Sequence, residues 1–337
     1  MRAWVSYGGG GLQQLQLETR SLPQPGPGQV RLRMRAAAVA LRDFKLVGGA
    51  YGDAGVRVPG GEGVGEIEAL GDGVEGWQLG QRASPLFVHG YTAERITPEA
   101  IAASSLGGLR RDGCFAEAML ADAAALVAVP PHLSDAAAAT LPFAGLTAWC
   151  ALRSAAPAPG DWVVVQGPIG VMLAALQFAH AAGAQVIVTS KNDDKLARAR
   201  AAGAAQTINY QSTPEWAAAV REITRGAGAS LVLDPGGTQT IAQSLQALRP
   251  GGTCAVVGAL GASPELGVSL PWLLGHGLRV VGCNGGSLAE HRAMAGAVSK
   301  SGIVPRVERV WPFESLPEAL AAAPKAEQFG KVVLQIG

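Results

Sequence analysis

The clearest pattern in the chain begins near residue 161, where short apolar runs alternate with longer, helix-favouring segments. Trp162 to Val165 is a continuous apolar run, which is typical of a strand buried on both faces of a sheet. A tight break at Gly167–Gly170 precedes an apolar, helix-favouring segment over residues 171–182 and a second buried strand over residues 185–189. These segments predict a βαβ unit, the kind of unit whose first turn can hold a dinucleotide pyrophosphate over a helix N-terminus.

The same alternation of strand and helix patterns continues for about a hundred residues. Strict alternation of this kind predicts an α/β fold with a parallel, doubly wound sheet. The predicted strands are residues 162–166, 185–189, 206–209, 230–234 and 253–258, and the predicted helices are residues 171–182, 193–201, 214–225 and 238–248.

Both ends of the chain have a different, β-rich pattern. Residues 1–35 predict a hairpin with a glycine-rich turn, and residues 29–35 alternate strictly between apolar and polar. Strands at 279–283, 304–311 and 331–336 and helices at 287–300 and 315–323 are predicted near the other end. We therefore predict one β-rich domain built from residues 1–126 and 266–337, with a cofactor-binding domain, residues 127–265, inserted between its parts.

Composition and charge indicate which kinds of partner to expect, and they leave the predicted domain organisation unchanged. Hydrophobic residues make up 48% of the chain and charged residues 16%, and the net charge is +1, with the cations scattered. We therefore expect neither a nucleic-acid nor a membrane partner, but a small-molecule substrate. The four cysteines form no close pair, and no run of 18 apolar residues or signal-like N-terminus is found, so we expect reduced thiols and a cytoplasmic protein.

The phosphate-binding fingerprint in the first βα turn is incomplete. The full signature is G-x-G-x-x-G, and Gly167 supplies its first glycine. Ile169 and Met172 stand where the next two glycines would be. The βαβ context therefore supports cofactor binding more strongly than the motif itself does.

Longer motifs resemble the medium-chain dehydrogenase/reductase superfamily along nearly the whole chain. They are GEGVGEIEALGDGV at 61–74, LPFAGLTAWCAL at 141–152, LRPGGTCAVVG at 248–258 and FGKVVLQI at 329–336. The nearest branch by resemblance is that of the zinc-free quinone-oxidoreductase-like enzymes. The resemblance implies a GroES-like catalytic domain, a Rossmann domain and an NAD(P)H cofactor.

The positions of the zinc ligands in zinc alcohol dehydrogenases carry other residues here. In that family a catalytic cysteine lies near position 39 or 40 and a histidine precedes Glu62, whereas this chain has Val39, Ala40 and Gly61. The five histidines share no ligand-like spacing. We therefore predict neither a catalytic nor a structural zinc, and favour reduction of an activated C=C bond or a quinone over alcohol oxidation. Ala40 and Leu41 also replace an Asn-Tyr pair of the zinc-free relatives.

The second predicted strand of the βαβ unit indicates the cofactor. It ends Val188-Thr189-Ser190-Lys191, without the carboxylate that binds the ribose hydroxyls in NAD-selective folds. Hydroxyls and cations suit a 2′-phosphate, so NADPH is favoured over NADH, although Lys191 and Lys195 could equally be solvated residues at a helix start. The resemblance assigns cofactor contacts to Thr147, Gly167, Pro168, Ile169, Gly170, Val171, Ser190, Lys195, Tyr210, Gly258 and Leu260.

Hydride transfer to an enone or quinone leaves negative charge on an oxygen, which needs a hydrogen-bond donor or a proton source. Tyr51 is the first candidate, with Lys45 and Arg42 beside it, and the other reading of Tyr51 is a partly buried surface tyrosine. His89 and Tyr91 are further candidates, although His89 also reads as an ordinary loop histidine. Asp43 and Glu62 read as structural carboxylates.

These observations predict a cytoplasmic, zinc-independent, NADPH-dependent oxidoreductase that reduces an activated double bond or a quinone. The alternative is a protein of the same fold whose cleft serves a non-redox step, such as a cyclisation, or ligand binding. By resemblance we expect a homodimer formed by edge strands near residues 279–284. The substrate itself is not indicated by any motif.

Overall fold

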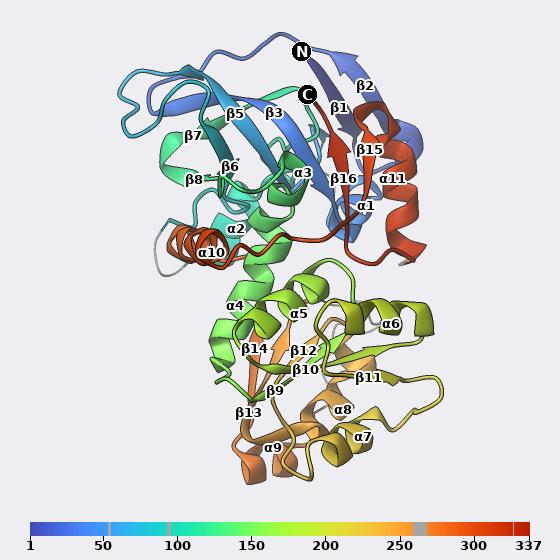
Figure 1. Ribbon diagram of the computed structural model, residues 1–337. Helices are drawn as coiled ribbons and strands as arrows, with labels where there is room; N and C mark the ends of the chain where they lie inside the picture. The colour runs from blue at the N-terminus through green and yellow to red at the C-terminus, as the bar shows by residue number, and fades with distance from the viewer. Residues whose placement is uncertain (53–54, 93–95, 259–267, 326) are drawn as a thin grey trace. The chain divides into compact units, whose positions relative to one another are not determined.

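The computed structural model describes residues 1–52, 55–92, 96–258, 268–325 and 327–337. It contains two compact units (Figure 1). The terminal unit comprises Met1–Leu146 and Gly285–Gly337, and the central unit comprises Thr147–Asn284. The unit borders therefore lie at 146/147 and 284/285, while the sequence analysis placed domain borders at 126/127 and 265/266. The predicted α/β class with a parallel, doubly wound sheet is confirmed.

The central unit is built on a six-stranded parallel sheet (Figure 1). Its order is β11-β10-β9-β12-β13-β14, which is the doubly wound order of a Rossmann fold. The inner strands β10, β9, β12 and β13 carry buried apolar side chains on both faces because helices cover them, whereas the edge strand β14 is mostly exposed. They are β9 (Trp162–Gln166), β10 (Gln185–Ser190), β11 (Gln206–Asn209), β12 (Ala229–Asp234), β13 (Leu248–Val256) and β14 (Arg279–Gly282).

The helices of the central unit fall close to their predicted ranges, with one clear correction. The segment 238–248 was predicted as one helix, but it begins with a 3-10 turn at Gly237–Gln239, and helix α8 covers only Ile241–Gln246. Leu248 already belongs to strand β13, paired with Ala229. The other helices are α4 (Leu146–Ala155), α5 (Val171–Ala181), α6 (Asp193–Ala201), α7 (Trp216–Ile223) and α9 (Leu270–His276).

The terminal unit combines both ends of the chain in one seven-stranded sheet. Strand β16 (Lys331–Gln335) pairs antiparallel with β3 (Gln29–Val39), so the last strand lies beside one of the first. The main path is β15-β16-β3-β5-β6-β8, and β7 also pairs with β3. The remaining strands are β5 (Glu62–Leu70), β6 (Arg82–Pro85), β7 (Ala118–Asp122), β8 (Leu126–Ala128) and β15 (Val307–Pro312).

A small second sheet, in the order β2-β1-β4, contains the predicted N-terminal hairpin. Its strands are β1 (Arg2–Tyr7), β2 (Leu15–Thr19) and β4 (Val56–Arg57). The helices of the terminal unit begin where a capping side chain or a proline favours it, as at the predicted N-cap Ser134. They are α1 (Leu41–Val47), α2 (Pro98–Ser104), α3 (Asp135–Ala138), α10 (Leu288–Ser301) and α11 (Leu316–Ala322).

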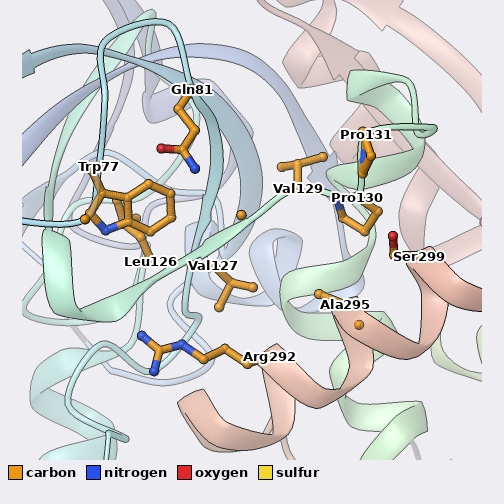
Figure 2. A pocket seen from close by; sticks show the side chains of 13 residues that line it. Trp77, Gln81, Leu126, Val127, Val129, Pro130, Pro131, Arg292, Ala295 and Ser299 are labelled. Atoms are coloured by element: carbon orange, nitrogen blue, oxygen red, sulfur yellow. The ribbon is translucent and has the colours of Figure 1, made fainter.

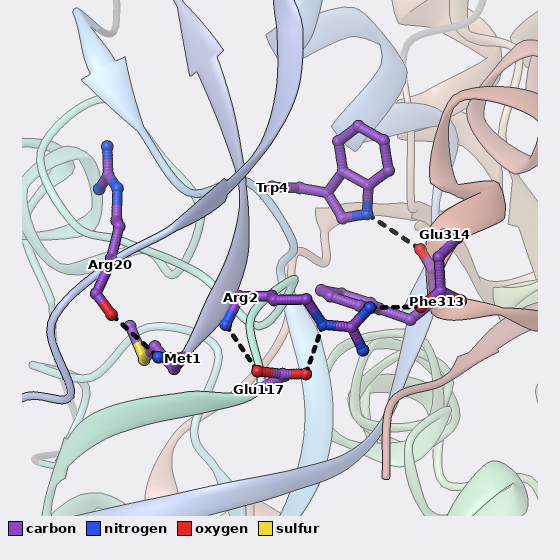
Figure 3. Close-up of polar contacts among 7 residues, drawn as sticks. All are labelled: Met1, Arg2, Trp4, Arg20, Glu117, Phe313 and Glu314. Atoms are coloured by element: carbon purple, nitrogen blue, oxygen red, sulfur yellow. Dashed lines mark hydrogen bonds and ion pairs between the residues drawn. The ribbon is translucent and has the colours of Figure 1, made fainter.

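Polar contacts fasten the N-terminal strand to distant parts of the terminal unit (Figure 3). The Arg2 guanidinium lies 2.7 Å from a carboxylate oxygen of Glu117 and 2.6 Å from one of Glu314. The indole N–H of Trp4 donates to the carbonyl of Phe313 at 2.9 Å. Since Glu314 and Phe313 lie more than three hundred residues from Arg2 and Trp4, these contacts help to hold both ends of the chain in one unit.

Candidate active site

The first βα turn of the central unit has the backbone that a phosphate-binding loop needs. Gly167 has a φ of 82°, and no atom lies within 4 Å of the position that a Cβ would take there. Gly170 has a φ of 52° and is the N-cap of α5, without a side chain that caps the helix. No side chain therefore blocks the N-terminus of α5, where backbone N–H groups can bind an anion.

The two residues that break the glycine fingerprint occupy different environments. Met172 lies in the first turn of α5 and is only 3% exposed, so its side chain packs into the core. Ile169 is half-buried within the turn itself, between Pro168 and Gly170. Its N–H bonds to the Gly167 carbonyl at 3.0 Å, which tightens the turn. Whether a dinucleotide pyrophosphate fits therefore depends on the backbone of Gly167–Val171. It does not require glycine at all three positions of the fingerprint.

The end of strand β10 gathers the residues predicted for the cofactor ribose. The Tyr210 N–H bonds to the Ser190 carbonyl at 3.2 Å, so these two lie side by side on neighbouring strands. The Asn192 side chain caps α6 by accepting from the Lys195 N–H at 3.0 Å. Lys195 itself is buried, with 8% of its surface exposed, whereas Tyr210 is 41% exposed. The carboxylate of Asp193 accepts a hydrogen bond from the Asn209 side chain at 2.7 Å.

A buried carboxylate that the sequence analysis missed lies at the end of β12. Asp234 is fully buried, and its Oδ1 accepts from the N–H groups of Gly236 and Gly237 and from the Thr240 hydroxyl. Its Oδ2 accepts from the Ser244 hydroxyl at 2.6 Å. This carboxylate holds the turn before α8 and explains why the predicted helix starts late. The apolar run that ends Asp-Pro-Gly-Gly was the signal for it.

The Asp234 network spans the point where the strand order reverses. Gln166, at the end of β9, donates from its side-chain amide to Ser244 at 2.7 Å. Strands β9 and β12 are neighbours that begin opposite halves of the sheet. Ligands of open α/β sheets bind outside the carboxyl ends of the strands at such a switch point. The network therefore supports the edge of the sheet where a dinucleotide would bind.

Three further residues predicted to contact the cofactor belong neither to the first βα turn nor to the end of β10. Thr147, on α4, is almost completely buried. Gly258 lies close to the turn after β12, because a Cβ there would be 3.2 Å from the Pro235 carbonyl oxygen. Leu260 lies outside the described residues.

In the terminal unit, Glu62 and Lys331 form a buried ion pair. The ammonium nitrogen and Glu62 Oε1 are 2.5 Å apart, and both side chains are at most 8% exposed. Oε2 of Glu62 accepts from the N–H groups of Phe143 and Ala144 at 3.2 and 3.0 Å. Burial raises the pKa of Glu62, and the nearby Lys331 ammonium opposes that rise. Glu62 is therefore a structural carboxylate that ties strand β5 to strand β16 and to the turn at 143–144.

Asp43 has a similar structural role in the first turn of α1. Its Oδ2 accepts from the Ala40 N–H at 2.9 Å and so caps the helix. The carboxylate is 1% exposed, and burial raises its pKa while the Arg42 guanidinium, 3.6 Å from Oδ1, lowers it. This agrees with the interpretation of Asp43 as structural.

Arg42 is the predicted catalytic residue with the most defined surroundings. Its guanidinium carbon lies 4.9 Å from the centre of the Phe87 ring, a cation–π contact. The same guanidinium donates to the Leu106 carbonyl at 3.4 Å. A Cβ at Gly61 would lie 3.2 Å from the Phe87 ring and 3.4 Å from Arg42 Nη1. Arg42 and Phe87 therefore crowd the place at which zinc-dependent relatives carry a ligand.

The residues present at this place do not fit a zinc ion. Ala40 and Gly61 offer no ligand atom, and burial together with Asp43 and Glu62 raises the pKa of the Cys114 thiol. A thiolate, the form that binds zinc, is thereby disfavoured. In the parts of the chain that the structure describes, no group of three or more His, Cys, Asp or Glu side chains could hold a metal ion.

The remaining donor candidates do not converge on one point. Lys45 lies one turn after Arg42 on α1 and is half-buried, while Tyr51 is 49% exposed in the turn that follows. Tyr91 is half-buried, and its carbonyl accepts from the Leu288 N–H. Helix α1 thus presents Arg42 and Lys45 together and leaves Tyr51 at the surface.

His89 occupies a buried position of its own. It is 3% exposed, and its Nδ1 lies 2.8 Å from the Leu86 carbonyl oxygen. Burial, and then the Arg111 charge, lower its pKa to about 4. The ring is therefore neutral near pH 7 with its N–H directed at the Leu86 carbonyl, which favours the structural interpretation of this residue.

A GroES-like unit with a parallel Rossmann sheet of this strand order defines a dehydrogenase or reductase of the medium-chain type, and comparison with known proteins agrees. The zinc-binding dehydrogenase family matches residues 169–300, and the alcohol dehydrogenase GroES-like domain matches residues 26–131. The zinc-type alcohol dehydrogenase-like protein C1773.06c of Schizosaccharomyces pombe is 39% identical over 83% of this chain and 82% of its own length. The chain belongs to the medium-chain dehydrogenase/reductase superfamily.

Solved structures give the same result over the full length. A protein of Sinorhizobium meliloti 1021 is 33% identical, with a TM-score of 0.90 and 99% of each chain covered. A structure named as an NAD-dependent alcohol dehydrogenase is 32% identical, with a TM-score of 0.88 and all of both chains covered. This protein is therefore an alcohol dehydrogenase-like oxidoreductase of a family that uses NAD(P). No helix among the described residues is long and apolar enough to cross a membrane.

Proposed function

We propose that this protein is a zinc-independent, NADPH-dependent reductase of the cytoplasm that transfers a hydride to an activated C=C bond or a quinone. The observation that carries the proposal is the replacement of ligand atoms by Arg42 and Phe87 around Gly61. The Arg42 guanidinium carries a positive charge and five N–H donors. In this proposal it polarises the substrate oxygen, a task that a metal ion performs in zinc-dependent relatives. The preferred substrates are therefore those whose carbonyl needs only hydrogen bonding.

The choice of NADPH rests on the residues at the end of β10. Ser190 and Tyr210 lie beside each other there, and Lys191 follows with its side chain exposed. Asp193, the nearest carboxylate in sequence, is already hydrogen-bonded to the Asn209 side chain. Hydroxyls and a cation at the end of a strand that itself carries no carboxylate suit a ribose 2′-phosphate better than two ribose hydroxyls.

The proposed reaction assigns a small number of tasks to the chain. When bound, the nicotinamide would supply the hydride, and the chain's part is to hold the electrophilic carbon of the substrate close to it. Arg42 donates hydrogen bonds to the oxygen on which negative charge develops. Lys45, one turn further along α1, supplies the proton that completes the reduction.

The test follows NADPH consumption with a panel of enones and quinones, after exhaustive dialysis against a chelator. We expect turnover that chelation does not reduce, and that Arg42→Gln lowers by about 10²-fold in kcat while NADPH affinity is kept. Arg33→Gln removes an arginine that is half exposed in a surface ion pair and serves as the matched control. Thermal melting of both variants separates lost catalysis from lost folding.

Three outcomes would contradict the proposal. Activity that depends on added zinc would overturn zinc independence, and tighter binding of NADH than of NADPH would overturn the choice of cofactor. Absence of saturable NADPH binding at millimolar concentration would overturn the redox role altogether. That last result would favour the alternative in which the same fold binds a ligand or performs a non-redox step.

A further inference from the structure

A pocket of about 450 Å³ lies in the terminal unit, and neither Arg42 nor Gly61 lines it. Figure 2 shows Trp77 and Gln81 along one side of it and Arg292, Ala295 and Ser299 of helix α10 along the other. Strand β8 and the residues that follow it form the wall between them. The volume falls within the range of about 300–1,000 Å³ that is usual for small-molecule sites.

The walls of this pocket, here called the α10 pocket, are held in place before any ligand arrives. The Trp77 indole N–H donates to the Ala123 carbonyl at 3.1 Å, which fixes the ring that forms one wall. Pro130 and Pro131 have restricted backbones and form another. A preformed wall of this kind lowers the entropy cost of binding.

One face of α10 lines the pocket with three small residues and one arginine. Arg292, Ala295, Gly296 and Ser299 follow each other at the spacing of a single helix face. No atom lies within 4 Å of the position that a Cβ would take at Gly296. A larger side chain would fit there without a clash, so the space is a consequence of this glycine.

The charge in the α10 pocket is uncompensated. Arg292 is the only charged residue that lines it, and in the described part of the chain its guanidinium has no ion pair or hydrogen bond. The nearby cation Arg82, by contrast, is paired with Asp135 at 2.8 Å. The hydroxyl of Ser299 and the amide of Gln81 add polar groups to walls that are otherwise mainly apolar.

From this arrangement we infer that the α10 pocket is a second ligand site, which binds a small amphipathic monocarboxylate with an aromatic body. The guanidinium of Arg292 receives the carboxylate, and the indole of Trp77 and the side chains of Val127 and Val129 contact the apolar body. One cation matches one negative charge, which favours a carboxylate over a doubly charged phosphate. The inference is independent of the proposed reductase activity.

The test is calorimetric titration of the full chain with 2-naphthoate, with and without NADPH. We expect one site per chain, unaffected by NADPH, and binding about tenfold weaker for the uncharged analogue 2-naphthylmethanol. Arg292→Gln should weaken naphthoate binding about tenfold, because the charge partner is lost. Lys300→Gln removes a cation from the same helix but outside the pocket, and it should bind as the unchanged protein does.

A second variant fills the space instead of removing the charge. Gly296→Leu places a helix-favouring side chain in the open position, so the helix is kept while naphthoate binding is lost. Circular dichroism of both variants checks the fold. Absence of saturable binding to the unchanged protein, equal binding by Arg292→Gln, or displacement of naphthoate by NADPH would each overturn the inference.

Discussion

At the scale of single residues, the buried pair of Glu62 and Lys331 shows how strongly one contact depends on the whole terminal unit. The two positions are far apart in the chain, and neither side chain is more than 8% exposed. A buried charge is tolerated only when a partner and hydrogen bonds compensate the lost hydration. Glu62 has both, since it also accepts from two backbone N–H groups.

Removal of one partner should therefore be costly. Lys331→Met leaves the Glu62 carboxylate buried without its cation, and we expect the free energy of unfolding to fall by about 3–5 kcal/mol. Urea titration measures the change. The matched control is Arg33→Met, which breaks the exposed pair with Glu66 and should cost less than about 1 kcal/mol. If both variants lost the same free energy of unfolding, burial would not make the Glu62–Lys331 pair more important for stability than an exposed pair.

At the scale of elements, helix α10 carries a buried histidine that makes its packing sensitive to pH. His291 is 1% exposed, and its Nε2 lies 3.4 Å from the Ser84 hydroxyl of β6. Burial lowers its pKa to about 3, well below the ordinary value near 6.5. The unfolded chain therefore binds a proton below pH 6.5 that the folded chain excludes, and stability falls as pH drops through this window.

We expect His291→Leu to flatten this dependence. Between pH 7 and pH 5 the unchanged protein should lose about 2 kcal/mol of unfolding free energy through His291, and the variant should lose that much less. His89, with a pKa lowered to about 4, adds a loss of the same sign that both proteins share. Denaturant titrations at the two pH values provide the measurement. An unaltered slope in His291→Leu would contradict this prediction.

At the scale of the whole molecule, strand β14 forms one edge of the central sheet, and no strand of the described residues pairs with its outer side. Strand β14 is at the edge of the sheet, and Val280 on it is 38% exposed. Leu270 and Leu274 on α9, the helix just before it, are 65% and 79% exposed. An apolar edge of this kind normally pairs or is covered, which supports the predicted homodimer through residues 279–284.

The homodimer is tested by light scattering. We expect twice the chain mass for the unchanged protein and the mass of one chain for Val280→Asp, because a carboxylate at the edge resists burial between two strands. Val310→Asp changes a valine that is 46% exposed on β15, the edge strand of the terminal unit, and should leave the dimer intact. A monomeric unchanged protein would refute the prediction.

Local pattern alone determined most of the architecture of this protein. Most strands and helices predicted from residue 162 onward lie within a few residues of their predicted ranges, because period, chain breaks and capping residues act over short distances. Strand β13 begins at Leu248 and not at residue 253, and helix α9 was not predicted. The late start of α8 does not follow from the period. Its signal is the Asp-Pro-Gly-Gly sequence, in which the Asp234 carboxylate accepts from Gly236, Gly237 and Thr240 and holds the turn before the helix.

Only the tertiary structure decided which polar residues meet. It paired Glu62 with Lys331, laid Arg42 against Phe87, buried Lys195 and His89, and left Tyr51 at the surface. It also formed the α10 pocket from a loop, a strand and a helix that are distant in the sequence. Periodicity reports which face of an element is buried, whereas the identity of its neighbours depends on strand order and packing, and these are properties of the folded chain.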